Sequence, residues 1–127
     1  RGTHGFHTKN SGLGGVHGWG TFKPGRYGGE KTAVVYAKIK DTKKDRRLAA
    51  LEVQFVDADG NVDYNVLWNT KDIKGRTAQV SVQSYNLHEL RIRECRGYQY
   101  KKKKKWNFKS TKCGSWRVYY QGTRITN

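Results

Sequence analysis

The sequence of 127 residues contains no Met, a single Pro, two Cys and no long hydrophobic run. Ala33–Ala37 is among its longest apolar stretches, far short of the roughly 20 residues that a membrane-spanning helix needs. The absence of Met in a chain that opens at Arg1 favours a processed or trimmed polypeptide, and a removed signal peptide would explain it. The length fits one domain with a core of moderate size.

Acidic residues are also scarce, with 10 Asp and Glu against 26 Lys and Arg, for a formal charge of +16. The excess is concentrated at one end. Residues 91–127 carry twelve Lys or Arg and one acidic residue, a net +11, whereas residues 32–90 have a net charge of only +1. This distribution indicates an anionic partner for the C-terminal third, although such charge can also serve solubility alone.

The two cysteines, Cys95 and Cys113, are 18 positions apart. In an oxidising compartment they predict one disulfide, which would stabilise the fold by roughly 3 kcal/mol in the chain-entropy model. The alternative is a pair of buried free thiols in a cytosolic protein. Together with the absence of Met, the pair favours a secreted, extracellular protein.

Residues 1–30, here called the arm, hold ten of the fifteen glycines. Because each glycine loses much backbone entropy on ordering, this composition argues against a helix or a packed core. Apolar and aromatic side chains nevertheless recur through the arm: Phe6, Leu13, Val16, Trp19, Phe22 and Tyr27. Either the arm folds back over its own domain, or it becomes ordered against another protein with these side chains as anchors. We favour the second interpretation because the anchors are regularly spaced.

From Lys31 onward, apolar and polar residues alternate with period two, which indicates β-strands. Six short strands are expected, near residues 33–39, 51–55, 62–68, 80–82, 90–92 and 116–120. No segment has a convincing amphipathic helical pattern. The sequence therefore predicts an all-β protein: a small antiparallel β-sandwich, Greek-key or immunoglobulin-like, over residues 31–127, preceded by the extended arm.

Candidate metal sites are weak. Asp57–Asp63 superficially resembles a calcium loop, but its glycine falls two positions early and Trp68 stands where a bidentate Glu is needed, so Asp59-Gly60 predicts a hairpin turn. His4, His7 and His17 lack a thiol or carboxylate to complete a four-ligand set. We predict neither a metal nor a cofactor.

Acid–base cleavage of RNA would need two proton-transfer groups on one side of a phosphate, with a cation beside it. His88 and Glu89, with Arg91 or Arg93, are the best candidates. In a strand, however, adjacent residues point to opposite faces, so His88 and Glu89 would not act together. We therefore predict no catalytic residue and no enzyme, with an RNase-like toxin as the enzymatic alternative.

Five consecutive lysines, Lys101–Lys105, lie between the cysteines, with Tyr98 and Tyr100 before them and Trp106 and Phe108 after them. The aromatic spacing suits two strands of a hairpin whose tip is the lysine run. Phosphate neutralisation and base stacking use these residue types, so Tyr100, Lys101–Lys105 and Trp106 are the candidate residues for an anionic partner. Alternatively, a lysine-rich tip is simply hydrated and prevents edge-to-edge aggregation.

Three stretches carry a resemblance to known proteins: Val35-Tyr-Ala-Lys-Ile-Lys-Asp-Thr-Lys-Lys-Asp45, Leu90-Arg-Ile-Arg-Glu-Cys95 and Lys112-Cys113-Gly-Ser-Trp116. In these the chain resembles small exported β-sandwich proteins of streptomycetes and other actinobacteria, among them the small adaptor subunit of umbrella toxin particles. The similarity spans roughly residues 33–117. It implies a non-catalytic linker between protein subunits, and the lysine-rich residues 96–112 depart from the common pattern.

The sequence thus predicts a secreted, non-enzymatic adaptor in a secreted antibacterial toxin complex, whose arm docks into a protein partner. One alternative is a cationic, antimicrobial protein that binds nucleic acid or an anionic surface. The other is an RNase-like toxin.

Overall fold

The computed structural model describes residues 4–8, 16–27, 30–41, 47–57, 59–69, 76–82, 87–121 and 124–125. Some residues are described only by their backbone, and nothing is said of their side chains: His4, Phe6, 24–27, 30–33, Asp41, 76–82, Leu87 and 124–125. All structural statements below concern the described residues.

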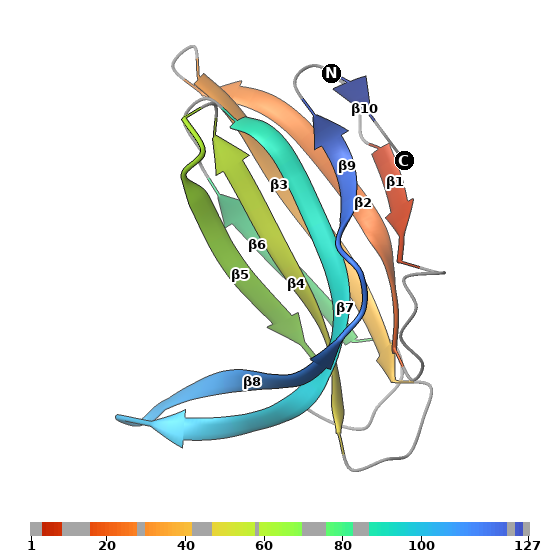
Figure 1. Cartoon of the computed structure of the whole chain (residues 1–127), viewed down its shortest axis with the longest axis vertical. Coiled ribbons are helices and arrows are strands. Elements are labelled where there is room, and N and C mark those ends of the chain that lie inside the picture. Colours follow the sequence, from red (N-terminus) through yellow and green to blue (C-terminus); the bar gives the residue numbers. More distant parts are fainter. Residues whose placement is uncertain are drawn as a thin grey trace.

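In this part of the chain the secondary structure is entirely β (Figure 1). The strands are β1 (His4–His7), β2 (Val16–Tyr27), β3 (Glu30–Asp41), β4 (Leu48–Asp57), β5 (Val62–Trp68), β6 (Arg76–Val82), β7 (Leu87–Lys102), β8 (Lys105–Cys113), β9 (Arg117–Gln121) and β10 (Arg124–Ile125). They form a four-stranded sheet in the order β1-β2-β3-β6 and a six-stranded sheet. Five strands of the second sheet follow the order β10-β9-β7-β4-β5, and its sixth strand, β8, pairs with β7. All the pairings are antiparallel.

Both sheets contribute to one hydrophobic core. Its members are Val16, Phe22, Val35, Ala37, Ile39, Ala49, Leu51, Val53, Phe55, Leu67, Leu90, Ile92, Tyr119 and Tyr120. Along β3, β4 and β7 the core residues occur at every second position, because successive side chains of a strand point to opposite faces. The alternation that predicted these strands therefore also fixes which face each strand buries.

The predicted all-β, antiparallel fold with one disulfide is confirmed. Five of the six expected strands lie within an observed strand, the sixth (116–120) overlaps β9 from Arg117 onward, and the hairpin around the lysine run is present as β7 and β8. The finer assignment to a Greek-key or immunoglobulin-like sandwich stays a prediction. Within the described residues there is no helix of the length and apolarity that a membrane crossing requires.

Part of the arm is paired into the four-stranded sheet. Its residues 16–27 form β2, which pairs with β3 along its whole length, and Val16 and Phe22 belong to the core. Glycine makes this pairing possible, because a Cβ on Gly20 would lie 1.9 Å from the backbone oxygen of Tyr36. A glycine that argued against a packed segment is thus, at position 20, a site of close backbone approach within a sheet.

Buried polar contacts connect the start of the chain to the six-stranded sheet. Thr8 follows β1, and its hydroxyl donates a hydrogen bond to the Glu94 carboxylate of β7. Both residues are buried. The hydroxyl of Tyr119 in β9 donates to the backbone oxygen of His7, at 2.8 Å. For these residues the structure matches the interpretation in which the arm folds back over its own domain.

We expect Phe22→Ala to lower the free energy of unfolding by about 3–5 kcal/mol, the cost of removing a large side chain from a packed core, because Phe22 is 0% exposed. Val62→Thr is the control. Val62 is 48% exposed at the edge strand β5, so its replacement should change stability by no more than about 0.5 kcal/mol. Urea unfolding followed by circular dichroism measures both. An equal, small loss in the two variants would contradict the placement of β2 in the core.

Candidate functional site

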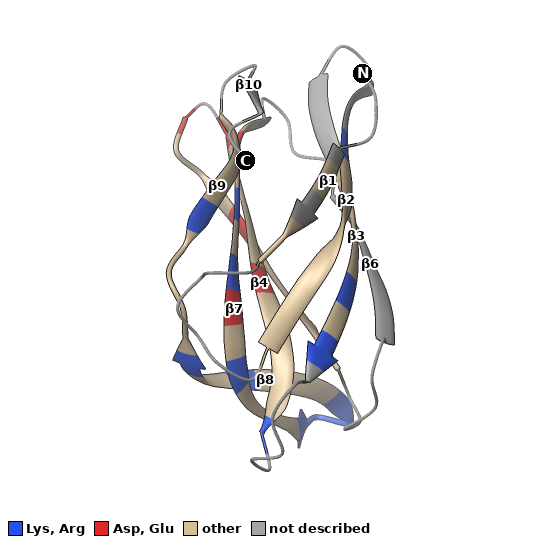
Figure 2. Cartoon of the chain, turned by 90° about the vertical axis from the view of Figure 1, so that its right-hand side faces the viewer, with Lys and Arg blue, Asp and Glu red and all other residues tan. Residues whose placement is uncertain are grey.

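A two-stranded ribbon is the most prominent feature outside the core. It consists of residues 97–110: the end of β7, a turn at Lys103 and Lys104, and the first part of β8. Figure 1 shows the ribbon leaving the other strands at the lower left of the molecule. Its tip is Lys101–Lys105, and all five lysines are exposed. Figure 2 shows these basic residues at the lower end, with the acidic residues of β4 and β7 higher in the molecule.

The turn at the tip has an unusual composition. Lys103 and Lys104 have φ angles of 50° and 62°, and they connect the paired residues Lys102 and Lys105. A two-residue hairpin loop with positive φ at both central positions is a type I′ turn, for which Asn-Gly is the strongly preferred sequence. Two lysines in this left-handed conformation cost free energy that Asn-Gly would not.

The ribbon has two chemically different faces, which the register of β7 and β8 defines. Tyr98 pairs with Lys109, Tyr100 with Asn107 and Lys102 with Lys105, and since directly paired residues share a face, these six make one face. We call it the tyrosine face. The opposite face carries Gln99, Lys101, Trp106, Phe108 and Ser110, and we call it the tryptophan face.

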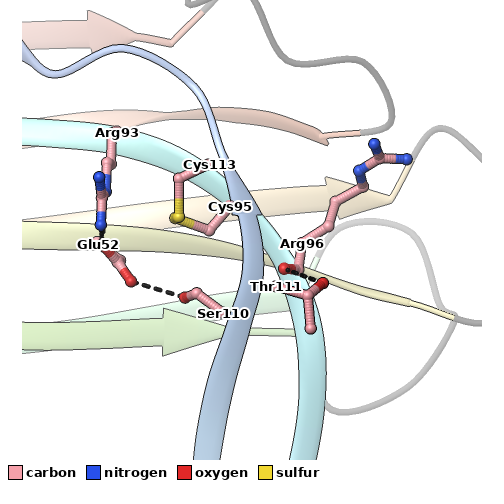
Figure 3. The surroundings of a disulfide bond; sticks show 7 residues. All are labelled: Glu52, Arg93, Cys95, Arg96, Ser110, Thr111 and Cys113. Carbon is pink, nitrogen blue, oxygen red and sulfur yellow. Dashed lines mark hydrogen bonds and ion pairs between the residues drawn. A yellow bond between two sulfur atoms is a disulfide. The ribbon is translucent and has the colours of Figure 1, made fainter.

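At its root the ribbon is joined to the six-stranded sheet by the disulfide. Cys95 of β7 and Cys113 of β8 face each other across the pair with a Cα–Cα distance of 4.1 Å. The predicted disulfide is therefore present. Immediately beyond it the register shifts, and the Thr111 hydroxyl donates to the backbone oxygen of Arg96 at 3.1 Å (Figure 3). Gly97 is required there, because a Cβ would lie 2.0 Å from the backbone oxygen of Lys109.

A buried carboxylate lies beside the disulfide on the outer face of the six-stranded sheet, the face away from the core (Figure 3). Glu52 of β4 is 1% exposed. It accepts a hydrogen bond from Arg93 at 2.5 Å and one from the Ser110 hydroxyl at 2.6 Å. The Arg93 guanidinium also lies over the Trp116 ring, 4.4 Å from its centroid. Glu52 thereby connects β4, β7 and the ribbon.

A third contact holds the tryptophan face against β5. The Trp68 ring stacks on Phe108 with centroids 5.5 Å apart, and its indole N–H donates to the side-chain oxygen of Gln99 at 3.2 Å. With the disulfide and the Ser110–Glu52 hydrogen bond, this contact fixes the direction in which the ribbon leaves the sheet. Within the ribbon tip there is one weaker contact, a cation–π interaction in which the Lys101 ammonium lies 5.7 Å from the Trp106 ring centroid.

The candidate residues for an anionic partner are only partly brought together. Lys101–Lys105 share the tip as predicted, but Tyr100 and Trp106 lie on opposite faces of the ribbon. Tyr98 and Lys109, which were not among those candidates, lie on the same face as Tyr100. Period-two alternation along β7 places Tyr98 on the face of Tyr100, whereas the position of Lys109 follows only from the register of the hairpin.

The arm anchors are divided between core and surface. Val16 and Phe22 are buried in the core, so in this structure their side chains are not available to a partner. Trp19 is half-buried, with its ring 5.0 Å from that of His17. Phe6 and Tyr27 lie on β1 and β2, but their side chains, and all of Leu13, are outside the described residues.

The residues considered for RNA cleavage do not assemble. His88 is exposed and is the additional residue of β7 where its pairing with β4 shifts register, whereas Glu89 is buried and bound by Arg91 and Gln121. Arg93 is bound to Glu52. The described residues therefore hold no arrangement of two proton-transfer groups around one phosphate position among these candidates.

Asp57 organises the turn between β4 and β5. Its carboxylate accepts hydrogen bonds from the backbone N–H groups of Asp59 and Asn61, at 2.9 and 2.8 Å, and Gly60 has a φ of 88°. These bonds, chiefly the one from Asn61, lower the pKa of Asp57. The hairpin turn predicted at Asp59-Gly60 is confirmed.

Among the described residues, one group of three possible metal ligands converges, with ligand atoms within 4.8 Å of one another: Glu52, Cys95 and Cys113. Both sulfur atoms are committed to the disulfide, and the thiolate is the form that binds metal. Glu52 is already bound by Arg93 and Ser110. The group is therefore a structural junction.

Comparison of the chain with protein-family models, with curated proteins and with solved structures finds no match. The resemblance to exported actinobacterial proteins, including the umbrella toxin adaptor, stays a prediction.

Tyr64 on β5 gives a pH-dependent test of the Glu52 junction. Burial, and the hydrogen bond of its hydroxyl to Glu52, raise the pKa of Tyr64 above its ordinary value of 10.0. The neutral phenol is thus favoured by folding, so its stabilisation is complete below about pH 10 and is lost as the pH rises further. We expect wild-type stability to fall more steeply above about pH 10 than that of Tyr64→Phe.

Urea unfolding at a series of pH values measures this difference. Lysine deprotonation affects both proteins equally, so the difference in stability between wild type and Tyr64→Phe reports the titration of Tyr64 alone. Parallel stability curves through this range would show that Tyr64 makes no bond to Glu52 that depends on its proton.

Proposed function

We propose that this chain is a secreted, non-enzymatic binding protein whose ribbon tip binds an anionic macromolecule. The disulfide supports the extracellular location, because such bonds persist in oxidising compartments. The tip supports the anionic partner: its five exposed lysines lie in a stretch, 95–113, that also contains Arg96, Lys109 and Lys112 and no acidic residue.

The observation that carries this proposal is the conformation of Lys103 and Lys104. A hairpin needs only a well-formed turn at this position, and Asn-Gly would form it without strain. The two lysines instead hold left-handed backbone at a cost of about 1 kcal/mol each and add repulsion between neighbouring ammonium groups. Because the sequence departs from the preferred turn residues in favour of two lysines, we infer that the charge of these lysines has a function.

The fixed root of the ribbon also supports the proposal. The disulfide, the Ser110–Glu52 hydrogen bond and the Trp68–Phe108 stack hold the strands in one direction. Charges on such a support are presented without the entropy loss that ordering a flexible segment on binding would require. Because the attraction is electrostatic, the affinity should fall steeply as salt concentration rises.

A second proposal is the adaptor function that the resemblance implies, with a protein partner in a secreted antibacterial assembly. Trp19 supports it, since it is the described arm anchor whose ring stays partly exposed. Trp19→Ser should then abolish capture of the partner from the culture medium of the producing organism, while leaving the fold intact. Capture that survives this change would remove the arm from the interaction.

The main test replaces Lys101–Lys105 with Ser and measures binding to a short single-stranded DNA, to heparin and to phosphatidylglycerol vesicles at several salt concentrations. We expect wild type to bind at least one of these polyanions with a strong salt dependence. The variant should lose at least about tenfold in affinity, since five cations are removed. Binding that is unchanged in the variant would show that the tip is only hydrated.

A second variant separates charge from folding. Lys103→Asn with Lys104→Gly should raise the stability of the protein, because the turn gains its preferred residues, and should weaken polyanion binding. The matched control is Lys23→Ser with Lys38→Ser, which removes two exposed lysines of the four-stranded sheet. If this control weakens binding as much, net charge and not the tip is responsible.

A further inference from the structure

The tyrosine face of the ribbon carries two exposed aromatic rings at a regular spacing. Tyr98 and Tyr100 occupy alternate positions of β7, with ring centroids 6.4 Å apart and an angle of 57° between the rings. Their exposed fractions are 42% and 39%. Further back along β7 the same face is buried, at Leu90, Ile92 and Glu94, but the ribbon has left the sheets before it reaches the tyrosines (Figure 1).

Lysines surround these two rings. Lys109 is paired with Tyr98 across the ribbon, and Lys102 and Lys105 form the next pair on the same face beyond Tyr100. All three are exposed. Between Arg96 and Cys113 the sequence contains no acidic residue that could neutralise them. The face therefore combines two aromatic platforms with three cations.

Most side chains of the tryptophan face are engaged in contacts within the protein. Phe108 is stacked on Trp68, and Gln99 accepts the hydrogen bond from the same indole. Ser110 is bonded to Glu52. Contacts within the protein thus use most of that face, and Trp106, 53% exposed, is its large exposed ring.

From this arrangement we infer that the tyrosine face binds single-stranded nucleic acid, with two successive bases stacked on Tyr98 and Tyr100 and the phosphates beside Lys102, Lys105 and Lys109. The inference rests on the proposed function and names its partner. A nucleotide couples one planar base to one negative charge, which is the combination that this face repeats. A duplex keeps its bases stacked inside and does not use the tyrosines. An anionic membrane takes up exposed rings by burial at its interface, where leucine serves as well as tyrosine, and therefore needs no π-face.

The decisive variant is Tyr98→Leu with Tyr100→Leu. Leucine keeps apolar surface on the strand but removes the π-face, so affinity for a short single-stranded DNA should fall at least about tenfold. Tyr98→Phe with Tyr100→Phe keeps both rings and should bind like wild type. Trp106→Leu, which changes the other face, should bind within about threefold of wild type, less than the loss of one stacked base. Fluorescence anisotropy measures the affinities, and thermal unfolding confirms that each variant is folded.

Duplex DNA, heparin and phosphatidylglycerol vesicles serve as comparison ligands. Their binding should depend on Lys101–Lys105 but not on the two tyrosines. If the Leu variant binds single-stranded DNA like wild type while the five-lysine variant does not, this inference is overturned and the proposed function stands. An equal loss for heparin or vesicles in the Leu variant would also overturn it, as would an equal loss for Trp106→Leu. If the lysine variant loses nothing with any ligand, both proposals fail.

Discussion

The alternation of side chains along β7 from Leu90 onward is the constraint on which the rest of the structure depends. The even-numbered residues Leu90, Ile92 and Glu94 face the core, while Arg93 and Cys95 face outward to the Glu52 junction. The shift in pairing with β4 adds His88 to β7 before this stretch, whereas the shifts against β8 and β9 place the additional residues, Thr111 and Tyr119, in the partner strands. β7 can therefore bend out of the sheet without exchanging its two faces.

This continuity explains why the two faces of the ribbon have different roles. The outward face of β7 continues as the tryptophan face, so Phe108 and Ser110 meet partners that already belong to the sheet, Trp68 and Glu52. The core-facing side continues as the tyrosine face, where Tyr98 and Tyr100 are 42% and 39% exposed. One face anchors the ribbon and the other is free for a ligand. The Glu52–Arg93 ion pair joins β4 to β7 on the outward face, and buried pairs of this kind contribute little net stability.

Much of the fold was predictable because strands with one buried face alternate strictly. The same rule does not apply at His88, where the pairing of β7 with β4 shifts register. β2 was missed because glycine is unfavourable in an isolated strand, and only the neighbouring backbone of β3 shows why Gly20 is needed. For the site, the lysine run was conspicuous and drew Tyr100 and Trp106 into one group. Their separation onto two faces depends on the register across the hairpin, and the buried contacts of Glu52 and Glu94 involve residues distant in sequence.

The free-energy cost of the strained, charged tip has little effect on the stability of the fold, because the tip lies outside the hydrophobic core. Repulsion among five lysines and two left-handed residues would destabilise a hairpin that stood alone, since isolated hairpins are marginal in water. Here the disulfide and the Glu52 junction close the ribbon at its root, so strain at Lys103 and Lys104 acts on a turn whose strands are already held together. The core between the sheets is not involved. A sequence can therefore alter the tip for binding while leaving the fold intact, and that independence makes a charged ribbon a suitable place for recognition.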